Sequence, residues 1–253
     1  MKFHTFKSLC AAGLLGAALT ATPVWALDFT DDGAALEGLL DPLAQDGDIG
    51  IDADQDEIGP DQYWMEGAAG GATSMVISLS NTTGESFGLY NTDTGETLEL
   101  FSDTNTQGDH VQLNIADNGD VTIIYYDAAG NLLGVDTQTG FLDSDTDQFG
   151  FYLTQGGETY YSVEEDNADG EDHMKAYEGN GEWIDPDGDG DYQPWDAGEY
   201  ILAWEASDGS GGSDFADFLV LVESLVPVPL PGTLALLGAG LLGLGWAARR
   251  RAA

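Results

Sequence analysis

The twelve residues DPDGDGDYQPWD, from Asp185 to Asp196, have the types and spacing best suited to chemistry in this chain. Counted from Asp185, acids occupy positions 1, 3, 5, 7 and 12, and Gly190 occupies position 6. Alternate residues of a tightly turning loop point inward, and glycine permits the positive φ that such a turn requires. Calcium takes six to eight oxygen ligands in irregular geometry. The stretch therefore predicts a Ca²⁺ site with ligands from Asp185, Asp187, Asp189, the main-chain carbonyl of Asp191, and Asp196.

The spacing is that of an EF-hand-type loop, but the flanking residues do not predict helices. Pro186 and Pro194 interrupt the segment, and the residues that follow it, Tyr200 to Trp204, have the composition of a strand. We therefore expect a calcium loop set between strands. The alternative is a solvated acidic turn, because closely spaced aspartates recur elsewhere in so acidic a chain.

A second candidate site combines residues that are distant in the sequence. The segment from Asn167 to His173 offers oxygen donors, and Asp214 and Asp217 stand immediately before an apolar run. We predict that Asn167, Asp169, Asp214 and Asp217 contribute metal ligands, with turn capping as the alternative role. Two further acidic segments match the calcium spacing less well, at residues 52–56 and 143–147.

The sequence gives little support for catalysis. With 46 acids, a pair of carboxylates suited to glycoside hydrolysis must occur somewhere and is uninformative. Gly-x-Ser-x-Gly, His-Glu-x-x-His and phosphate-loop motifs are absent from the sequence. We expect no enzymatic activity. Aromatic residues in or beside the predicted loops keep a carbohydrate-binding role open, because their rings can stack on sugars: Tyr63, Trp64, Tyr160, Tyr161, Trp183, Tyr192 and Trp195.

Residues 1–26 have a basic start, a short apolar run and a small residue at the end, which predicts a signal peptide and export.

The net charge of the rest of the chain limits the classes of molecule that it can bind. All 46 acids lie between Asp28 and Glu223, and Lys175 is the one basic residue among them, so this region carries a formal charge of −45. Such a charge excludes nucleic acid and anionic lipid as natural partners. The same region has no cysteine, so divalent cations or high salt must offset the repulsion.

The remaining pattern predicts an all-β domain. Residues 27–72 form an acidic N-terminal segment with one short amphipathic helix over Gly33–Leu43, and residues 73–226 form the domain. Short β-branched and aromatic runs alternate with turn signals, which favours an antiparallel β-sandwich or jelly roll. The expected strands are residues 74–79, 110–115, 121–126, 149–153, 159–163, 200–204 and 218–222.

The C-terminal segment, residues 227–253, has three parts in order: the prolines of VPLP, an apolar run over 233–248, and Arg249 to Arg251. This arrangement resembles the PEP-CTERM sorting signal in its VPLP-type variant, with Leu230 in place of the usual glutamate. The resemblance implies a Gram-negative bacterium, export, processing by an exosortase-type membrane peptidase, and association with exopolysaccharide or biofilm. The apolar run then acts as a transient transmembrane helix whose arginines stay cytoplasmic.

A second resemblance covers residues 149–226, which look like a domain of unknown function common upstream of this tail. The motif Asp-Phe-Asn-Asp of that domain stands here as Asp214-Phe215-Ala216-Asp217. The resemblance implies a β-sandwich with a calcium-associated role.

The acidic loop, the signal peptide and the two resemblances together predict a secreted, calcium-stabilised surface or matrix structural protein. The alternatives are a carbohydrate-binding module that recognises exopolysaccharide and, third, a glycan-active enzyme.

Overall fold

A computed structural model describes residues 33–59, 61–67, 72–79, 84–143, 148–206 and 214–228. The predicted signal peptide and the apolar run of the predicted sorting signal lie outside these residues. Among the residues that are described, no helix is long and apolar enough to cross a membrane.

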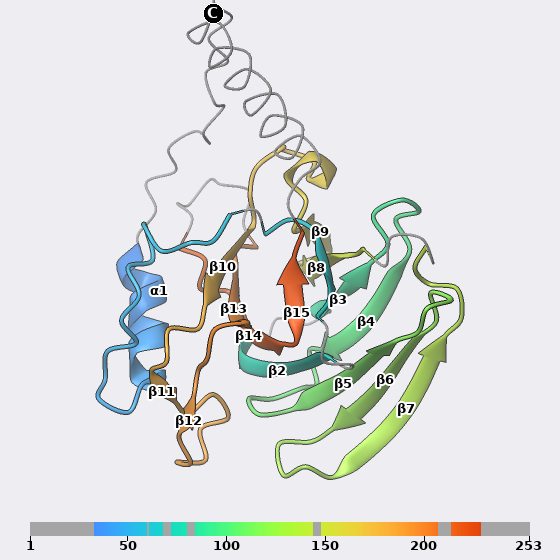
Figure 1. Ribbon diagram of the computed structural model, residues 1–253. Helices are drawn as coiled ribbons and strands as arrows, with labels where there is room; N and C mark the ends of the chain where they lie inside the picture. The colour runs from blue at the N-terminus through green and yellow to red at the C-terminus, as the bar shows by residue number, and fades with distance from the viewer. Residues whose placement is uncertain are drawn as a thin grey trace, which may run out of the picture.

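Two antiparallel sheets dominate the described part of the chain (Figure 1). The larger sheet has seven strands in the order β10-β13-β14-β2-β5-β6-β7, and the smaller has four in the order β4-β3-β8-β9. The large sheet comprises β2 (Ala72–Leu79), β5 (His110–Ile115), β6 (Val121–Tyr126), β7 (Leu132–Gln138), β10 (Met174–Glu178), β13 (Glu199–Trp204) and β14 (Phe218–Glu223). The small sheet comprises β3 (Ser86–Tyr90), β4 (Thr97–Ser102), β8 (Gly150–Gln155) and β9 (Glu158–Tyr161).

Two short antiparallel pairs and three short helical segments complete the described fold. β1 (Trp64–Glu66) pairs with β15 (Leu225–Pro227), and β11 (Trp183–Ile184) pairs with β12 (Gln193–Pro194). The helical segments are α1 (Gly33–Leu40) and the 3₁₀ turns Asp41–Leu43 and Glu164–Asp166. The predictions of an all-β domain with antiparallel strands and of a short helix at the N-terminal side are confirmed.

The main core lies between the two sheets. Phe87 of β3 reaches across the interface, and its ring centroid lies 5.9 Å from that of Trp204 on β13 and 4.9 Å from that of Phe218 on β14. Alternation explains how the sheets face each other, since Val111 and Leu113 of β5 are buried while the residues between and beyond them are exposed or half-buried. The two sheets therefore pack face to face over a common apolar cluster.

A second apolar cluster covers the opposite face of the large sheet at its β10–β14 end. Leu36 and Leu40 of α1 pack there with Ile201 of β13 and Leu219 of β14. Both faces of β13 and β14 are consequently buried, which accounts for their nearly continuous apolar sequences. The acidic N-terminal segment thus contributes apolar side chains to the same folded unit, and Figure 1 shows α1 beside the β10 end of the sheet.

Candidate metal centre

The acidic stretch predicted from Asp185 to Asp196 begins directly after β11 and ends two residues after β12, so its residues 185–192 connect the two strands of this hairpin. The base of the hairpin is fixed to the N-terminal segment, because the N–H of Asp185 donates to the carbonyl of Leu43 at 2.9 Å and the N–H of Gln45 donates to the carbonyl of Trp183 at 2.9 Å. Ile184 and Trp195, on the two sides of the hairpin, are buried in the second apolar cluster. The fold therefore holds the loop firmly at its two ends.

The loop also contacts the turn between β4 and β5. The side-chain amide of Gln107 donates to the carbonyl of Pro186 at 3.1 Å. Gly108 has φ +86°, and a Cβ built on it would lie 3.1 Å from the Cβ of Asp187. This contact joins the loop to the large sheet at a second point.

Three of the predicted ligands converge. Asp185, Asp187 and Asp189 each place a carboxylate oxygen so that the three atoms lie within 4.8 Å of one another. Asp185 shapes the turn, because its two carboxylate oxygens accept from the N–H of Gly188 at 2.9 Å and of Gly190 at 3.0 Å. Both glycines have positive φ, +75° and +91°, which other residues adopt only with strain. Contiguous residues thus preorganise a set of oxygen atoms that suits a hard cation.

The electrostatics of this group also favour a cation. Burial raises the pKa of Asp187, and the contact with the Asp185 carboxyl and the charges of Asp189 and Asp185 raise it further, against the lowering effect of the hydrogen bond from the Asp189 amide. A bound divalent cation would lower the pKa of Asp187, because its positive charge favours the ionised form of each carboxylate.

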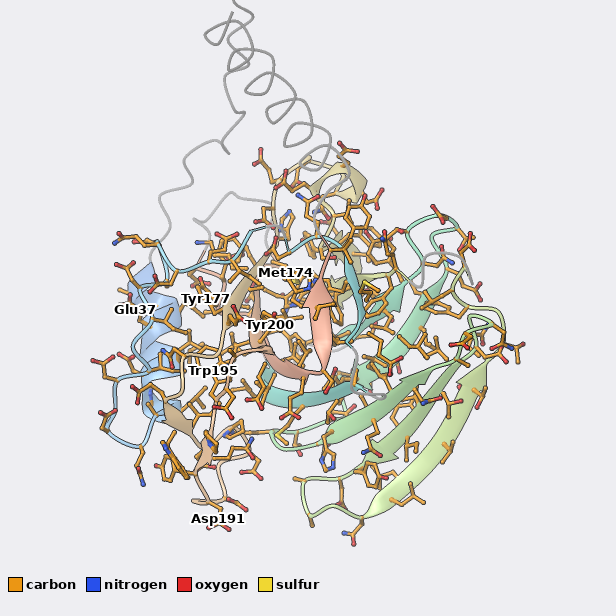
Figure 2. The ribbon with its side chains drawn as sticks, in the orientation of Figure 1. Glu37, Met174, Tyr177, Asp191, Trp195 and Tyr200 are labelled. Atoms are coloured by element: carbon orange, nitrogen blue, oxygen red, sulfur yellow. The ribbon has the colours of Figure 1, made fainter. Side chains whose placement is uncertain are left out.

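The side chains of the other two predicted residues, Asp191 and Asp196, are not among the three that converge. The Asp191 side chain is exposed at the outer end of the hairpin (Figure 2), but its backbone adjoins the group, because its N–H donates to Asp189 Oδ1 at 2.7 Å. Trp183 pairs with Pro194, and the backbone of Trp195 bonds both Gly181 and Glu182, so Asp196 lies beyond residue 181, at least four positions along the hairpin from Asp185. At about 3.3 Å per residue this separation is about 13 Å, too long for a shared ion. The structure therefore does not bring Asp196 to the position that would close an EF-hand-type shell.

Asn167 and Asp169 have local partners. The Asn167 side chain accepts from the N–H of Tyr161 at 2.7 Å and donates to the carbonyls of Tyr161 and Glu171 at 2.9 and 2.8 Å. These three bonds make Asn167 a clamp for the loop that follows β9. Asp169 contacts His173 Nε2 at 3.1 Å and accepts from the N–H of Glu171 at 3.2 Å. Burial raises the pKa of Asp169, but the amide of Glu171 and the contact with His173 outweigh it and lower that pKa.

Asp214 and Asp217 lie with a third acid that the sequence did not single out, Glu205. Glu205 is 3% exposed, and its Oε2 accepts from the N–H of Asp214 at 2.8 Å and of Phe215 at 3.2 Å. Burial raises the pKa of Asp217, and the charges of Glu205 and Asp214 and contact with the Glu205 carboxyl add to this, against the hydrogen bond from the Ala206 amide. The sequence signal that could have pointed to Glu205 is an acid directly after the predicted apolar strand, residues 200–204.

One histidine connects these two predicted sets. Nδ1 of buried His173 lies 2.9 Å from the carbonyl of Glu205, while its Nε2 faces Asp169. His173 therefore links Asp169 to Glu205, whose carboxylate in turn bonds the backbone of Asp214. Within the described part of the molecule, however, the one group whose ligand atoms already lie close enough for a shared metal is Asp185, Asp187 and Asp189.

Of the seven predicted surface aromatic residues, three are buried, and three, Tyr63, Tyr161 and Tyr192, are half-buried. Trp64 and Trp195 are fully buried, and Tyr160 is nearly so. Trp183 is the large exception, with 51% of its surface exposed at the base of the hairpin. It is the one predicted aromatic residue that offers a broad face to a ligand among those described.

Comparison with known proteins bears on the C-terminal segment. The family model described as the PEP-CTERM protein-sorting motif matches residues 227–251. No curated protein and no solved structure matched the chain. The matched segment begins at the last residue of β15, and the N–H of Val228 donates to the carbonyl of Tyr63 at 2.7 Å, so the fold fixes the point from which the segment departs. Residues 227–251 are thus a PEP-CTERM protein-sorting motif, which implies export and sorting to the cell surface through an exosortase-type system.

Proposed function

We propose that this protein is a calcium-stabilised structural component of the cell surface or of an exopolysaccharide matrix. The observation that carries the proposal is the convergence of Asp185, Asp187 and Asp189 in a loop anchored at both ends. The sorting motif supports the setting, since it directs the chain to a compartment where calcium is abundant. Transient membrane anchoring in a Gram-negative cell is part of this proposal.

Calcium would act here as a cross-link. The three carboxylates supply part of the six to eight oxygens that calcium takes, and main-chain carbonyls, including the one predicted at Asp191, and water supply the remainder. Because the loop contacts both the N-terminal segment and the β4–β5 turn, an ion held there stabilises more than the hairpin. A non-catalytic role follows from this proposal, and we assign no catalytic residue.

The test is thermal unfolding of the purified chain in calcium and in a chelator, compared with a pair of double variants. Asp187→Ala with Asp189→Ala should lose most of the calcium-dependent rise in melting temperature. Asp191→Ala with Asp196→Ala removes the same charge from the same loop and should keep that rise, because those side chains lie outside the convergent group. Equal responses from the two double variants would contradict the proposal.

Carbohydrate binding is the alternative function, and the exposed face of Trp183 favours it. An aromatic face beside an acidic loop can stack on a sugar ring while a bound cation holds the sugar hydroxyls. Binding to the exopolysaccharide of the producing cell should weaken in Trp183→Ala and stay unchanged in Leu39→Ala, an exposed residue of α1. Polysaccharide that becomes shorter during the incubation would indicate an enzyme instead.

A further inference from the structure

The edge strand β7 is unlike the rest of the described surface. Leu132, Leu133 and Val135 are 61%, 62% and 59% exposed, and they are three of the most exposed large apolar side chains described. β7 pairs with β6 on one side, and no described residue pairs with its other side. Figure 1 shows it at the margin of the molecule. A long, apolar, unpaired edge is a natural template for another strand.

The charge pattern identifies the partner. Residues 128–135 contain no charged side chain, and β7 itself contains one, Asp136, in a region with a formal charge of −45. Two copies of this chain repel over most of their surfaces, and this uncharged strand is a place where they can approach. We propose that β7 pairs antiparallel with β7 of a second copy, which joins the two large sheets across a two-fold axis.

The opposite edge of the same sheet explains why pairing should stop at two copies. The outer edge of β10 is engaged by the N-terminal segment, where the N–H of Ile58 donates to the carbonyl of Ala176 at 2.9 Å. One open edge per sheet gives an isologous, closed dimer, whereas two open edges would give a fibre.

The sequence of β7 suits self-pairing about its central residue. With Val135 on the two-fold axis, Asp136 lies opposite Gly134 of the second copy, so the two aspartates do not face each other. A Cβ built on Gly134 meets no atom within 4 Å, which leaves room on that side. The N–H of Thr137 is satisfied by Asp136 Oδ1 at 2.8 Å in the single chain. Pairing replaces that local bond by one between strands.

Cysteine pairs test the register directly. Cys10 is the single cysteine of the chain, so Cys10→Ser gives a cysteine-free background. The full chain is kept in mild detergent, which limits association through its apolar C-terminal run, and oxidised gently. Directly opposed residues of an antiparallel pair have Cα atoms about 4.5 to 5.5 Å apart, within disulfide range, whereas residues two positions off register exceed about 7 Å.

Val135→Cys should form a disulfide-linked dimer. Gly134→Cys and Asp136→Cys should each form little alone and should cross-link when the two chains are mixed. Leu39→Cys, which places a cysteine at an exposed apolar position on α1, is the matched control for random collision. If Val135→Cys cross-links no faster than Leu39→Cys, the proposal is wrong. If all positions cross-link equally, association runs through another surface and the proposal is equally wrong.

A second measurement separates pairing from misfolding. Leu133→Lys added to Val135→Cys should slow cross-linking about tenfold, because a charge on an edge strand discourages pairing, with the melting temperature unchanged. Asp136→Ala in the same background should speed it, because it removes a charge close to the axis and frees the Thr137 amide. Rates that do not respond to either change would overturn the assignment of β7 as the contact.

Discussion

The strongest test of the metal site is the double change Asp187→Ala and Asp189→Ala. In the absence of an ion, each pair among the three carboxylates repels by about 0.9 kcal/mol at 4.8 Å in water, and by about 3.5 kcal/mol at an effective dielectric constant of 20. The double change removes all three pairwise repulsions, because each pair includes Asp187, Asp189 or both. In a chelator, the variant should therefore be as stable as the parent chain or more stable.

Calcium should reverse this order. At a calcium concentration about 100 times the dissociation constant, binding adds about 2.7 kcal/mol to the free energy of unfolding. Extracellular sites bind at about 10⁻⁴ to 10⁻³ M, so about 10 mM calcium is needed for the tighter end of this range. For a domain of roughly 200 residues, this corresponds to an increase in melting temperature of about 5 to 10 °C. The variant should show little of that increase.

The assay is a melting curve followed by near-ultraviolet circular dichroism, with calcium or potassium chloride at equal ionic strength. Ionic strength is matched because salt alone screens the repulsion among exposed acids. A parent chain that responds equally to both salts would refute the idea of a specific ion. A double variant that keeps the whole calcium response would place the ion elsewhere, with the group around Glu205 as the next place to examine.

Three further outcomes are expected. Burial, together with the charges of Glu57 and Glu164, raises the pKa of Asp172 to about 7, while the hydrogen bond from the Met174 amide and the charge of Lys175 lower it. The protonated Asp172 should therefore stabilise the fold fully below about pH 4, and this contribution should disappear as the pH rises through 7. Melting curves in chelator should show this loss of stability, and Asp172→Asn should remove the loss near pH 7. Glu205→Ala should lower the free energy of unfolding by about 2 to 4 kcal/mol in denaturant titration, because two backbone amides lose their acceptor, while Glu205→Gln should cost much less. The intact mass of protein released from the cell surface should lack Arg249 to Arg251, and their retention would contradict processing at the sorting motif.

Sequence reasoning succeeded where one local pattern decides the structure. The strands β5 and β6 follow β-branched alternation, and β14 follows a continuous apolar run, so period and composition were sufficient. It did not find β7, whose residues are exposed on both faces and so carry no alternation to read. β3 was also missed. Its Gly88 interrupts the pattern because a Cβ there would lie 2.1 Å from the carbonyl of Leu98 on the neighbouring strand.

The same division applies to the candidate site. Asp185, Asp187 and Asp189 are close in sequence, and the positive-φ glycines between and beside them fix how the side chains converge. Asp196 depends on the register of the hairpin, which is set by the burial of Trp195 and by pairing with the N-terminal segment. Glu205 likewise owes its partners to a chain reversal that local spacing does not reveal. Residue spacing in the sequence does not predict such contacts, because they depend on strand register and tertiary packing.

The acidic residues of this chain differ in the kind of ion that relieves their electrostatic repulsion. Asp48 and Asp127, for example, accept from nearby backbone amides and form isolated turns, so screening by any salt relieves their mutual repulsion. The group of Asp185, Asp187 and Asp189 is different, because its carboxylate oxygens lie within 4.8 Å of one another. This distance is shorter than the screening length of about 8 Å at physiological ionic strength. Monovalent salt cannot neutralise charges that lie within one coordination sphere, whereas one divalent ion can. High salt should therefore stabilise the fold as a whole, and calcium should add a further increment that depends on Asp187 and Asp189.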